Sequence, residues 1–268
     1  MDIKPRQPIS MTRPFAFSFC LFSGILMTAL FPARGTGQAP PLRVLFLGNS
    51  YTYSNDMPAI LLSLAASGGD RLDYEMEVPD GASLEEHYQR GSVAMAIKEG
   101  TWDYVVLQEQ SLRPAMPVRQ VEREFFKYGE LLDRQIKTLH PGAKTVLYIT
   151  WGRWRHTGSL CELMPQACDY WGADSLITLR YRMLAKRIGA LTAPVGPAWR
   201  YMQAHHPEVE LFNPDAIHPS MEGSYLAACC MYAVIFNKDP ARLTYDYVLS
   251  PEVATMLRKV ASTVAFHP

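Results

Sequence analysis

The sequence has no excess charge of either sign. Its 268 residues include 26 basic and 26 acidic side chains, so the formal net charge is zero. No block or stripe of lysine and arginine occurs, and a nucleic-acid-binding surface is therefore not expected. No internal repeat is present either. With 48% hydrophobic and 19% charged residues, the composition is that of an ordinary globular protein.

No apolar run long enough to span a membrane occurs after the first forty residues. The beginning of the chain differs, because Lys4, Arg6 and Arg13 precede an apolar stretch over 14–31 and then several small residues. This order predicts a signal peptide over 1–35 and a secreted or periplasmic protein. An uncleaved N-terminal anchor is the alternative. Cleavage would leave 22 basic and 25 acidic residues, a small negative net charge.

Cysteine is scarce, with five residues in the chain, of which Cys20 falls in the signal segment. Cys161 and Cys168 enclose a short loop, and in an oxidising compartment this spacing predicts a local disulfide. The pair could instead bind a metal, but no nearby cysteine or histidine completes a zinc spacing, so we expect no metal site. Cys229 and Cys230 are expected to be small buried hydrophobic residues of a helix.

Short apolar runs alternate with longer amphipathic or apolar helical patterns. This alternation predicts one α/β domain over 41–268, with a mostly parallel five-stranded sheet. Strands are expected at 43–47, 72–78, 104–107, 144–150 and 193–195. Helices are expected at 58–66, 84–98 with an interruption near Gly91, 118–139, 173–189, 220–236 and 251–265.

Polar or small residues follow each of the first four predicted strands. They are Ser50, Gly81, 108–111 and 151–155. Because the carboxyl ends of parallel strands lie at one edge of the sheet, these residues should share a rim, where ligands of such sheets bind. The segment 152–172 is long for a strand–helix connection, and we expect it to form a flap over that rim.

Two short segments, 165 residues apart, carry the chemistry. Gly48-Asn49-Ser50 closes the first apolar run, and Asp215 to His218 precede a long apolar helix. A serine needs a base, usually histidine, and a carboxylate on the other imidazole nitrogen fixes the tautomer of that base. The spacing of Asp215 and His218 allows a turn in which the carboxylate reaches Nδ1 and Nε2 points outward. The catalytic residues are therefore predicted to be Ser50, His218 and Asp215.

These segments resemble the motifs of the SGNH hydrolase, or GDSL esterase/lipase, superfamily. The resemblance implies a flavodoxin-like three-layer α/β/α sandwich, with the nucleophile in Gly48-Asn49-Ser50, a glycine after the second strand at Gly81, and the Asp215–His218 pair before the last helices. Within the superfamily, the stretches 48–52, 106–111, 150–153 and 218–228 are similar to a group of exported bacterial SGNH-like proteins. This similarity bears on fold and compartment but not on substrate.

The third motif departs from the superfamily, which has Gly-x-Asn after the third strand where this chain has Gln108-Glu109-Gln110. Aligned on the preceding apolar run, Gln110 takes the place of the asparagine, and Gln108 is the rival if the register shifts by two. The oxyanion hole that the resemblance implies consists of the backbone N–H groups of Ser50 and Gly81 and the Gln110 side chain. A longer carboxamide can donate the same hydrogen bond.

The predicted function is serine-dependent ester hydrolysis, with a carbohydrate O-deacetylase as the finer expectation. The alternatives are an acyltransferase acting on a sugar hydroxyl and an inactive carbohydrate-binding relative. No cofactor is required, and the expected partner is a small-molecule or carbohydrate ester. The predicted substrate contacts are Tyr51, Gln108, Trp151 and Arg153.

Overall fold

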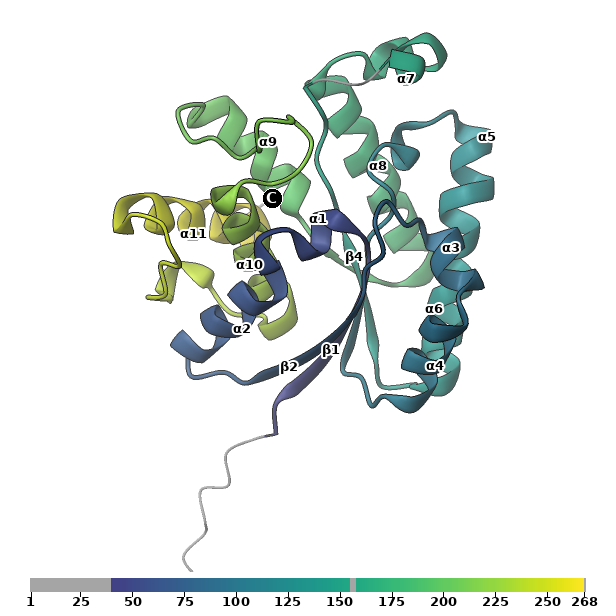
Figure 1. Cartoon of the computed structure of the whole chain (residues 1–268), viewed down its shortest axis with the longest axis horizontal. Helices are drawn as coiled ribbons and strands as arrows, with labels where there is room; N and C mark the ends of the chain where they lie inside the picture. The colour runs from purple at the N-terminus through teal and green to yellow at the C-terminus, as the bar shows by residue number, and fades with distance from the viewer. Residues whose placement is uncertain (1–39, 155–157, 268) are drawn as a thin grey trace, which may run out of the picture. The chain divides into compact units, whose positions relative to one another are not determined.

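Five parallel strands form one sheet in the computed structural model, which describes residues 40–154 and 158–267 (Figure 1). The strands are β1 (Leu42–Leu47), β2 (Leu72–Glu77), β3 (Tyr104–Leu107), β4 (Lys144–Tyr148) and β5 (Leu191–Ala193). Their spatial order is β2-β1-β3-β4-β5, and every neighbouring pair is parallel. This is the flavodoxin-like order, whose direction of winding reverses between β1 and β3. The predicted fold class is therefore confirmed.

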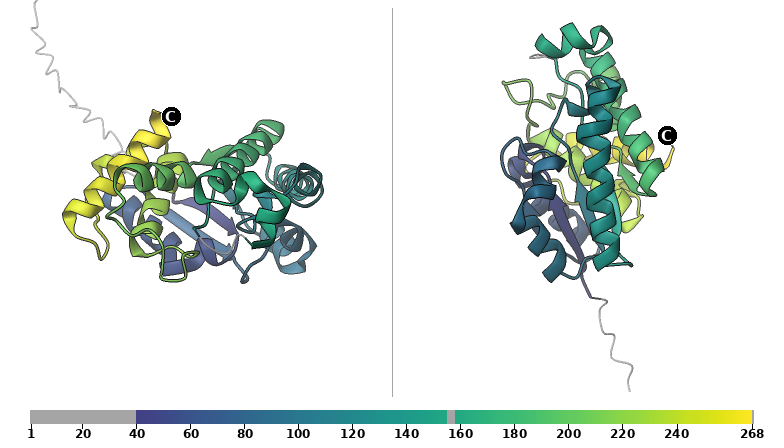
Figure 2. Two further views of the ribbon diagram at one scale, coloured as in Figure 1. Left: turned by 90° about the horizontal axis from the view of Figure 1, so that it is seen from above. Right: turned by 90° about the vertical axis from the view of Figure 1, so that its right-hand side faces the viewer.

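Helices cover both faces of the sheet, as the two views of Figure 2 show. They are α1 (Ser50–Tyr53), α2 (Met57–Ser67), α3 (Leu84–Gln89), α4 (Gly91–Glu99), α5 (Val118–Gln120), α6 (Lys127–Leu139), α7 (Gly158–Leu163), α8 (Tyr170–Ile188), α9 (Val195–His205), α10 (Met221–Phe236) and α11 (Pro251–Phe266). Shorter turns are η1 (Ser54–Asp56), η2 (Arg113–Ala115), the π-helical η3 (Val121–Phe126), η4 (Pro165–Ala167) and η5 (Pro240–Arg242).

Alternate residues of β1 face two separate cores. Val44 and Phe46 pack with α2, α9, α10 and α11, whereas Leu45 and Leu47 pack with α3, α4, α6 and α8. Because side chains of a strand alternate between faces, a strand covered on both sides must be apolar throughout. This explains the uninterrupted apolar run over 44–47 in β1, which directs Gly48 to the rim.

The interruption expected near Gly91 is found at Arg90, whose extended backbone separates α3 from α4. Several other elements differ from the sequence prediction. The fourth strand ends at Tyr148 rather than 150, and α9 was not among the predicted helical ranges. The fifth strand ends at Ala193 rather than 195, because Pro194 has no N–H to pair in a sheet and instead precedes α9. The single helix expected over 118–139 contains the π-helical η3.

A disulfide joins Cys161 and Cys168 in the connection between β4 and α8, which confirms that prediction. Cys229 and Cys230 are buried in α10 with free thiols. The predicted signal peptide over 1–35 and Arg155 of the predicted rim lie outside the described residues. No helix within the described ranges is long and apolar enough to cross a membrane.

Candidate active site

Ser50 is the first residue of α1, directly beyond β1, and Asn49 fixes its position. The Asn49 carboxamide accepts from the Tyr51 N–H (3.1 Å) and donates to the Ala82 carbonyl (2.9 Å). Its backbone N–H donates to Gln108 Oε1 (2.9 Å). Asn49 is only 3% exposed. Through its side chain and its backbone N–H, this one buried residue ties the nucleophile turn to the segments that follow β2 and β3.

Gly48 is required by the close packing of this turn. A Cβ at position 48 would lie 2.4 Å from Thr52 Oγ1 and 2.8 Å from Gln108 Oε1. Neither atom can retreat without losing its hydrogen bond to the other, which is 3.0 Å long. The glycine thus leaves room for the Gln108 side chain to accept the hydrogen bond from the Asn49 N–H.

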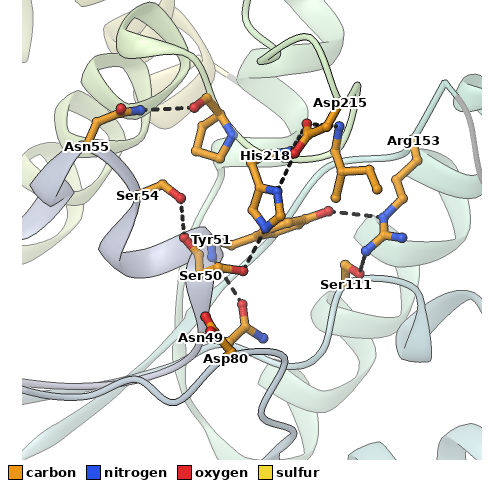
Figure 3. Close-up of polar contacts among 12 residues, drawn as sticks. Asn49, Ser50, Tyr51, Ser54, Asn55, Asp80, Ser111, Arg153, Asp215 and His218 are labelled. Atoms are coloured by element: carbon orange, nitrogen blue, oxygen red, sulfur yellow. Dashed lines mark hydrogen bonds and ion pairs between the residues drawn. The ribbon is translucent and has the colours of Figure 1, made fainter.

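The structure brings Ser50, His218 and Asp215 into a hydrogen-bonded chain (Figure 3). His218 Nε2 lies 2.9 Å from Ser50 Oγ, and His218 Nδ1 lies 2.6 Å from Asp215 Oδ2. The other carboxylate oxygen accepts from the N–H groups of Ile217 and His218, both at 2.9 Å. Burial acts to raise the pKa of Asp215, but these hydrogen bonds outweigh it and lower the pKa. An ionised Asp215 holds the imidazole with Nε2 toward the serine.

The loop that carries His218 is fixed from both sides. The Asn213 N–H donates to the His218 carbonyl (2.8 Å), and Ala216 adopts a left-handed backbone conformation within the turn. Asn55 Nδ2 lies 2.9 Å from the carbonyls of both Pro219 and Ser220. Sequence reasoning gave Asn55 no role in the site, yet it connects the nucleophile segment to the histidine loop. Its backbone has a positive φ, which asparagine tolerates, but no local sequence pattern reveals partners so distant in the chain.

Trp151 lies behind the loop rather than in contact with a substrate. It is 0% exposed and stacks between Tyr51 (ring centroids 4.5 Å apart) and Trp199 (3.9 Å), while its indole N–H donates to the Ile217 carbonyl. Tyr51 in turn presents its ring edge-on to His218. The predicted substrate contact of Trp151 is therefore wrong, because packing on both faces of the indole leaves no surface for a ligand.

The two candidate glutamines have different surroundings. Gln108 is 0% exposed; its Oε1 accepts from the Asn49 N–H and the Thr52 hydroxyl, and its Nε2 donates to the Glu109 carbonyl. The predicted substrate contact of Gln108 is therefore wrong as well. The Gln110 side chain lines a pocket with Ser50 and makes no hydrogen bond to any described residue.

That pocket has a volume of about 500 Å³ and opens at the rim of the sheet, where the strand order reverses. It is lined by Asn49, Ser50, Tyr51, Tyr53, Asp80, Gly81, Gln110, Ser111, Arg153, Ile217 and His218. Gly81 has a φ of +62°, which favours glycine. The Ser50 N–H belongs to the first residue of a helix and has no partner within it. The three groups of the predicted oxyanion hole thus belong to residues that line one pocket.

Arg153 forms part of the same wall. Its Nε donates to the Tyr51 hydroxyl at 3.1 Å, and a terminal nitrogen donates to Ser111 Oγ (Figure 3). No carboxylate of the described residues forms an ion pair with Arg153. Tyr51 itself is 2% exposed, so it contributes to the pocket mainly by holding Arg153 and packing against His218.

Glu109 is buried behind the pocket and does not line it. Its Oε1 accepts from the N–H groups of Gln110 (2.6 Å) and Leu84 (3.4 Å), and its Oε2 has no partner among the described residues. Burial raises the pKa of Glu109 to about 8, against the lowering effect of Arg113 and these two hydrogen bonds. Glu109 therefore connects the segments after β2 and β3 as a largely protonated carboxyl at neutral pH.

This burial predicts a pH-dependent stability. Between the unperturbed pKa of 4.5 and the folded value of about 8, the folded chain keeps a proton that the unfolded chain has released. The free energy of unfolding should therefore fall as the pH rises through that range. Glu109→Gln should flatten this slope in urea unfolding at several pH values. The exposed control Glu252→Gln should leave it unchanged, and a wild-type slope in Glu109→Gln would contradict the assignment.

Solved structures that share this fold include the following three proteins. A protein from Slackia heliotrinireducens assigned to the SGNH hydrolases is 28% identical, with a TM-score of 0.61 over 73% of this chain and 100% of that chain. A DUF4886 family protein from Bacteroides uniformis is 17% identical, with a TM-score of 0.70 over 85% of this chain and 96% of that chain. An acetylxylan esterase from Geobacillus stearothermophilus is 14% identical, with a TM-score of 0.54 over 72% of this chain and 94% of that chain. No family model matches the sequence, and no curated protein matches it significantly.

Proposed function

Because the chain belongs to the SGNH hydrolase superfamily, we propose that it is a serine-dependent ester hydrolase with Ser50 as nucleophile. One observation carries the proposal: the hydrogen-bonded chain from Ser50 through His218 to Asp215 opens into a pocket at the sheet's reversal point. In a parallel sheet, ligands bind at this place. The arrangement supplies a nucleophile, a base and a group that orients the base.

The proposed reaction has two halves. His218 Nε2 accepts the proton of Ser50 Oγ as the oxygen attacks the ester carbonyl, and then donates that proton to the departing alcohol. Water enters with His218 again as base and releases the acid from Ser50. The negative oxygen of each tetrahedral intermediate is stabilised by the N–H groups of Ser50 and Gly81 and by the Gln110 carboxamide.

The pocket wall favours a short acyl group on a hydroxylated alcohol. Around Ser50 it presents the polar side chains of Asp80, Gln110, Ser111 and Arg153. Two tyrosines, Tyr51 and Tyr53, also line it, and Ile217 is the only aliphatic side chain among its lining residues. A long acyl chain would leave these groups without hydrogen bonds and would cost binding free energy. We therefore favour a carbohydrate O-deacetylase within the proposed esterase activity.

Export to an oxidising compartment is part of the same proposal. The Cys161–Cys168 disulfide is of a kind that persists outside the reducing cytosol, which accords with the signal peptide predicted over 1–35. The segment 152–172 is proposed to be a flap beside the pocket, since Arg153 at its beginning lines the pocket wall.

The proposal is tested by reaction with a fluorophosphonate probe. The probe should modify the purified, folded wild-type protein once, and peptide mass spectrometry should locate the phosphonyl group on Ser50. A folded protein that does not react would instead support the inactive carbohydrate-binding alternative.

A further inference from the structure

A second groove lies close to the pocket that contains Ser50. It has a volume of about 590 Å³ and lies between the segment after β4, the region at the end of α9 and the loop before Asp215. Its lining includes Trp154, Gln203, Glu210, Phe212, Asn213 and Ala216. None of these residues takes part in the proposed chemistry, so the groove is not part of the proposed catalytic machinery.

Two chain segments lead from the pocket to the groove. Arg153 and Ile217 line the pocket, and their chain neighbours Trp154 and Ala216 line the groove. Because consecutive Cα atoms are about 3.8 Å apart, the two hollows lie close together along the same two segments. This proximity is what a ligand of several rings would need to contact both.

Trp154 is held rigidly although it is 48% exposed. It stacks on Tyr170, with ring centroids 4.8 Å apart and planes at 16°, and its ring lies edge-on to Trp171 at 6.2 Å. Tyr170 is itself fully buried and contacts Phe212. A large aromatic surface that is exposed yet ordered is characteristic of a binding site, because little conformational entropy remains to be lost on binding.

Three polar side chains share the lining with Phe212 and several small apolar residues. The side chains of Gln203, Glu210 and Asn213 make no hydrogen bond or ion pair with any described residue. The two carboxamides can donate to and accept from hydroxyl groups, and the carboxylate can accept from them. A groove that combines one aromatic face with such groups matches a pyranose ring, which has an apolar C–H face and a rim of hydroxyls.

We infer that this groove, with Trp154 as its platform, binds a neutral sugar residue next to the one whose ester enters the pocket. The substrate class is then an acylated oligosaccharide or polysaccharide rather than a free monosaccharide. This identification as a substrate rests on the proposed esterase function, whereas the binding of the saccharide does not.

The binding is tested without turnover in the Ser50→Ala protein. Xylotetraose and cellotetraose, both unacetylated, are titrated by calorimetry, and at least one should bind with a measurable Kd. Adding Trp154→Ala should weaken that Kd about tenfold or more. The matched control is Tyr88→Ala, since Tyr88 is 40% exposed and lines a groove of about 560 Å³ between α3 and α6. It should leave the Kd unchanged.

Kinetics separate a binding role from a structural one. In the otherwise wild-type protein, Trp154→Ala should lower kcat/KM for acetylated xylotetraose at least tenfold more than for 4-nitrophenyl acetate, chiefly through KM. Equal losses on both substrates would show that Trp154 acts by supporting the fold of the site. A selective loss on 4-nitrophenyl octanoate would show that the groove takes an acyl chain. Either result overturns the inference, as does the failure of both tetrasaccharides to bind.

Failure of the esterase proposal would look different. Absent hydrolysis of 4-nitrophenyl acetate and absent fluorophosphonate labelling would remove the proposed chemistry, while the calorimetric titration would still decide whether Trp154 belongs to a saccharide site.

Discussion

Replacing Ser50 by alanine should reduce hydrolysis of 4-nitrophenyl acetate by about 10⁴- to 10⁶-fold, as expected when a nucleophile that acts as a unit with its base is removed. The fold should survive, because the change deletes one hydroxyl whose hydrogen bond is to His218. The expected loss of stability is within about 1 kcal/mol. Both quantities can be measured on the same preparation, by initial rates and by thermal unfolding.

Ser67→Ala provides the matched control. Its hydroxyl donates to the Leu64 carbonyl at the end of α2 and does not line the pocket. This variant should keep wild-type turnover. If Ser50→Ala retained more than about a hundredth of wild-type activity while folded, a different nucleophile would be required.

Gln110→Ala should lower kcat by about 100- to 1,000-fold with a much smaller change in KM, which is the usual cost of removing one oxyanion donor. Gln110→Glu should be at least as damaging, because it keeps the side-chain length but replaces the donor by an acceptor. Both variants should unfold at nearly the wild-type temperature, since the Gln110 side chain has no hydrogen bond in the described structure. An effect on KM alone would place Gln110 in substrate binding instead.

Gln108→Ala should give the opposite pattern. This change leaves the Asn49 N–H and the Thr52 hydroxyl without their shared acceptor inside the protein. Each unsatisfied buried group costs about 1–3 kcal/mol, so the main result should be a marked loss of stability. Comparing the two variants decides which glutamine acts in the pocket. A stable Gln108→Ala protein with greatly reduced kcat would reverse the assignment.

The sequence was a good guide wherever the relevant contacts are local or periodic. The apolar runs over 44–47 and 104–107 predicted central strands because burial on both faces leaves no place for polar side chains. The pair Asp215 and His218 could be predicted for a similar reason, since a spacing of three residues lets one turn bring the two side chains together. The order of the strand ends then placed Ser50 and Gly81 at one rim.

The sequence was a poor guide where residues far apart in the chain pack against each other. Trp151 and Arg153 are two residues apart on one segment, yet Trp151 is enclosed by Tyr51 and Trp199 whereas Arg153 lines the pocket. Nothing in their local pattern distinguishes the two. Asn55 was missed for the same reason, because its partners lie more than 160 residues along the chain.

By itself the sequence indicated the parallel α/β sheet, the rim at which the candidate site lies, and Ser50, His218 and Asp215 as the candidate catalytic residues. Only the tertiary structure showed that Gln108 is buried whereas Gln110 lines the pocket, that Trp151 lies in the core, and that Trp154 lines a second groove. The physical reason is that periodicity records which face of an element is buried. Whether a polar side chain at the rim is buried or open depends on segments that the fold alone brings beside it.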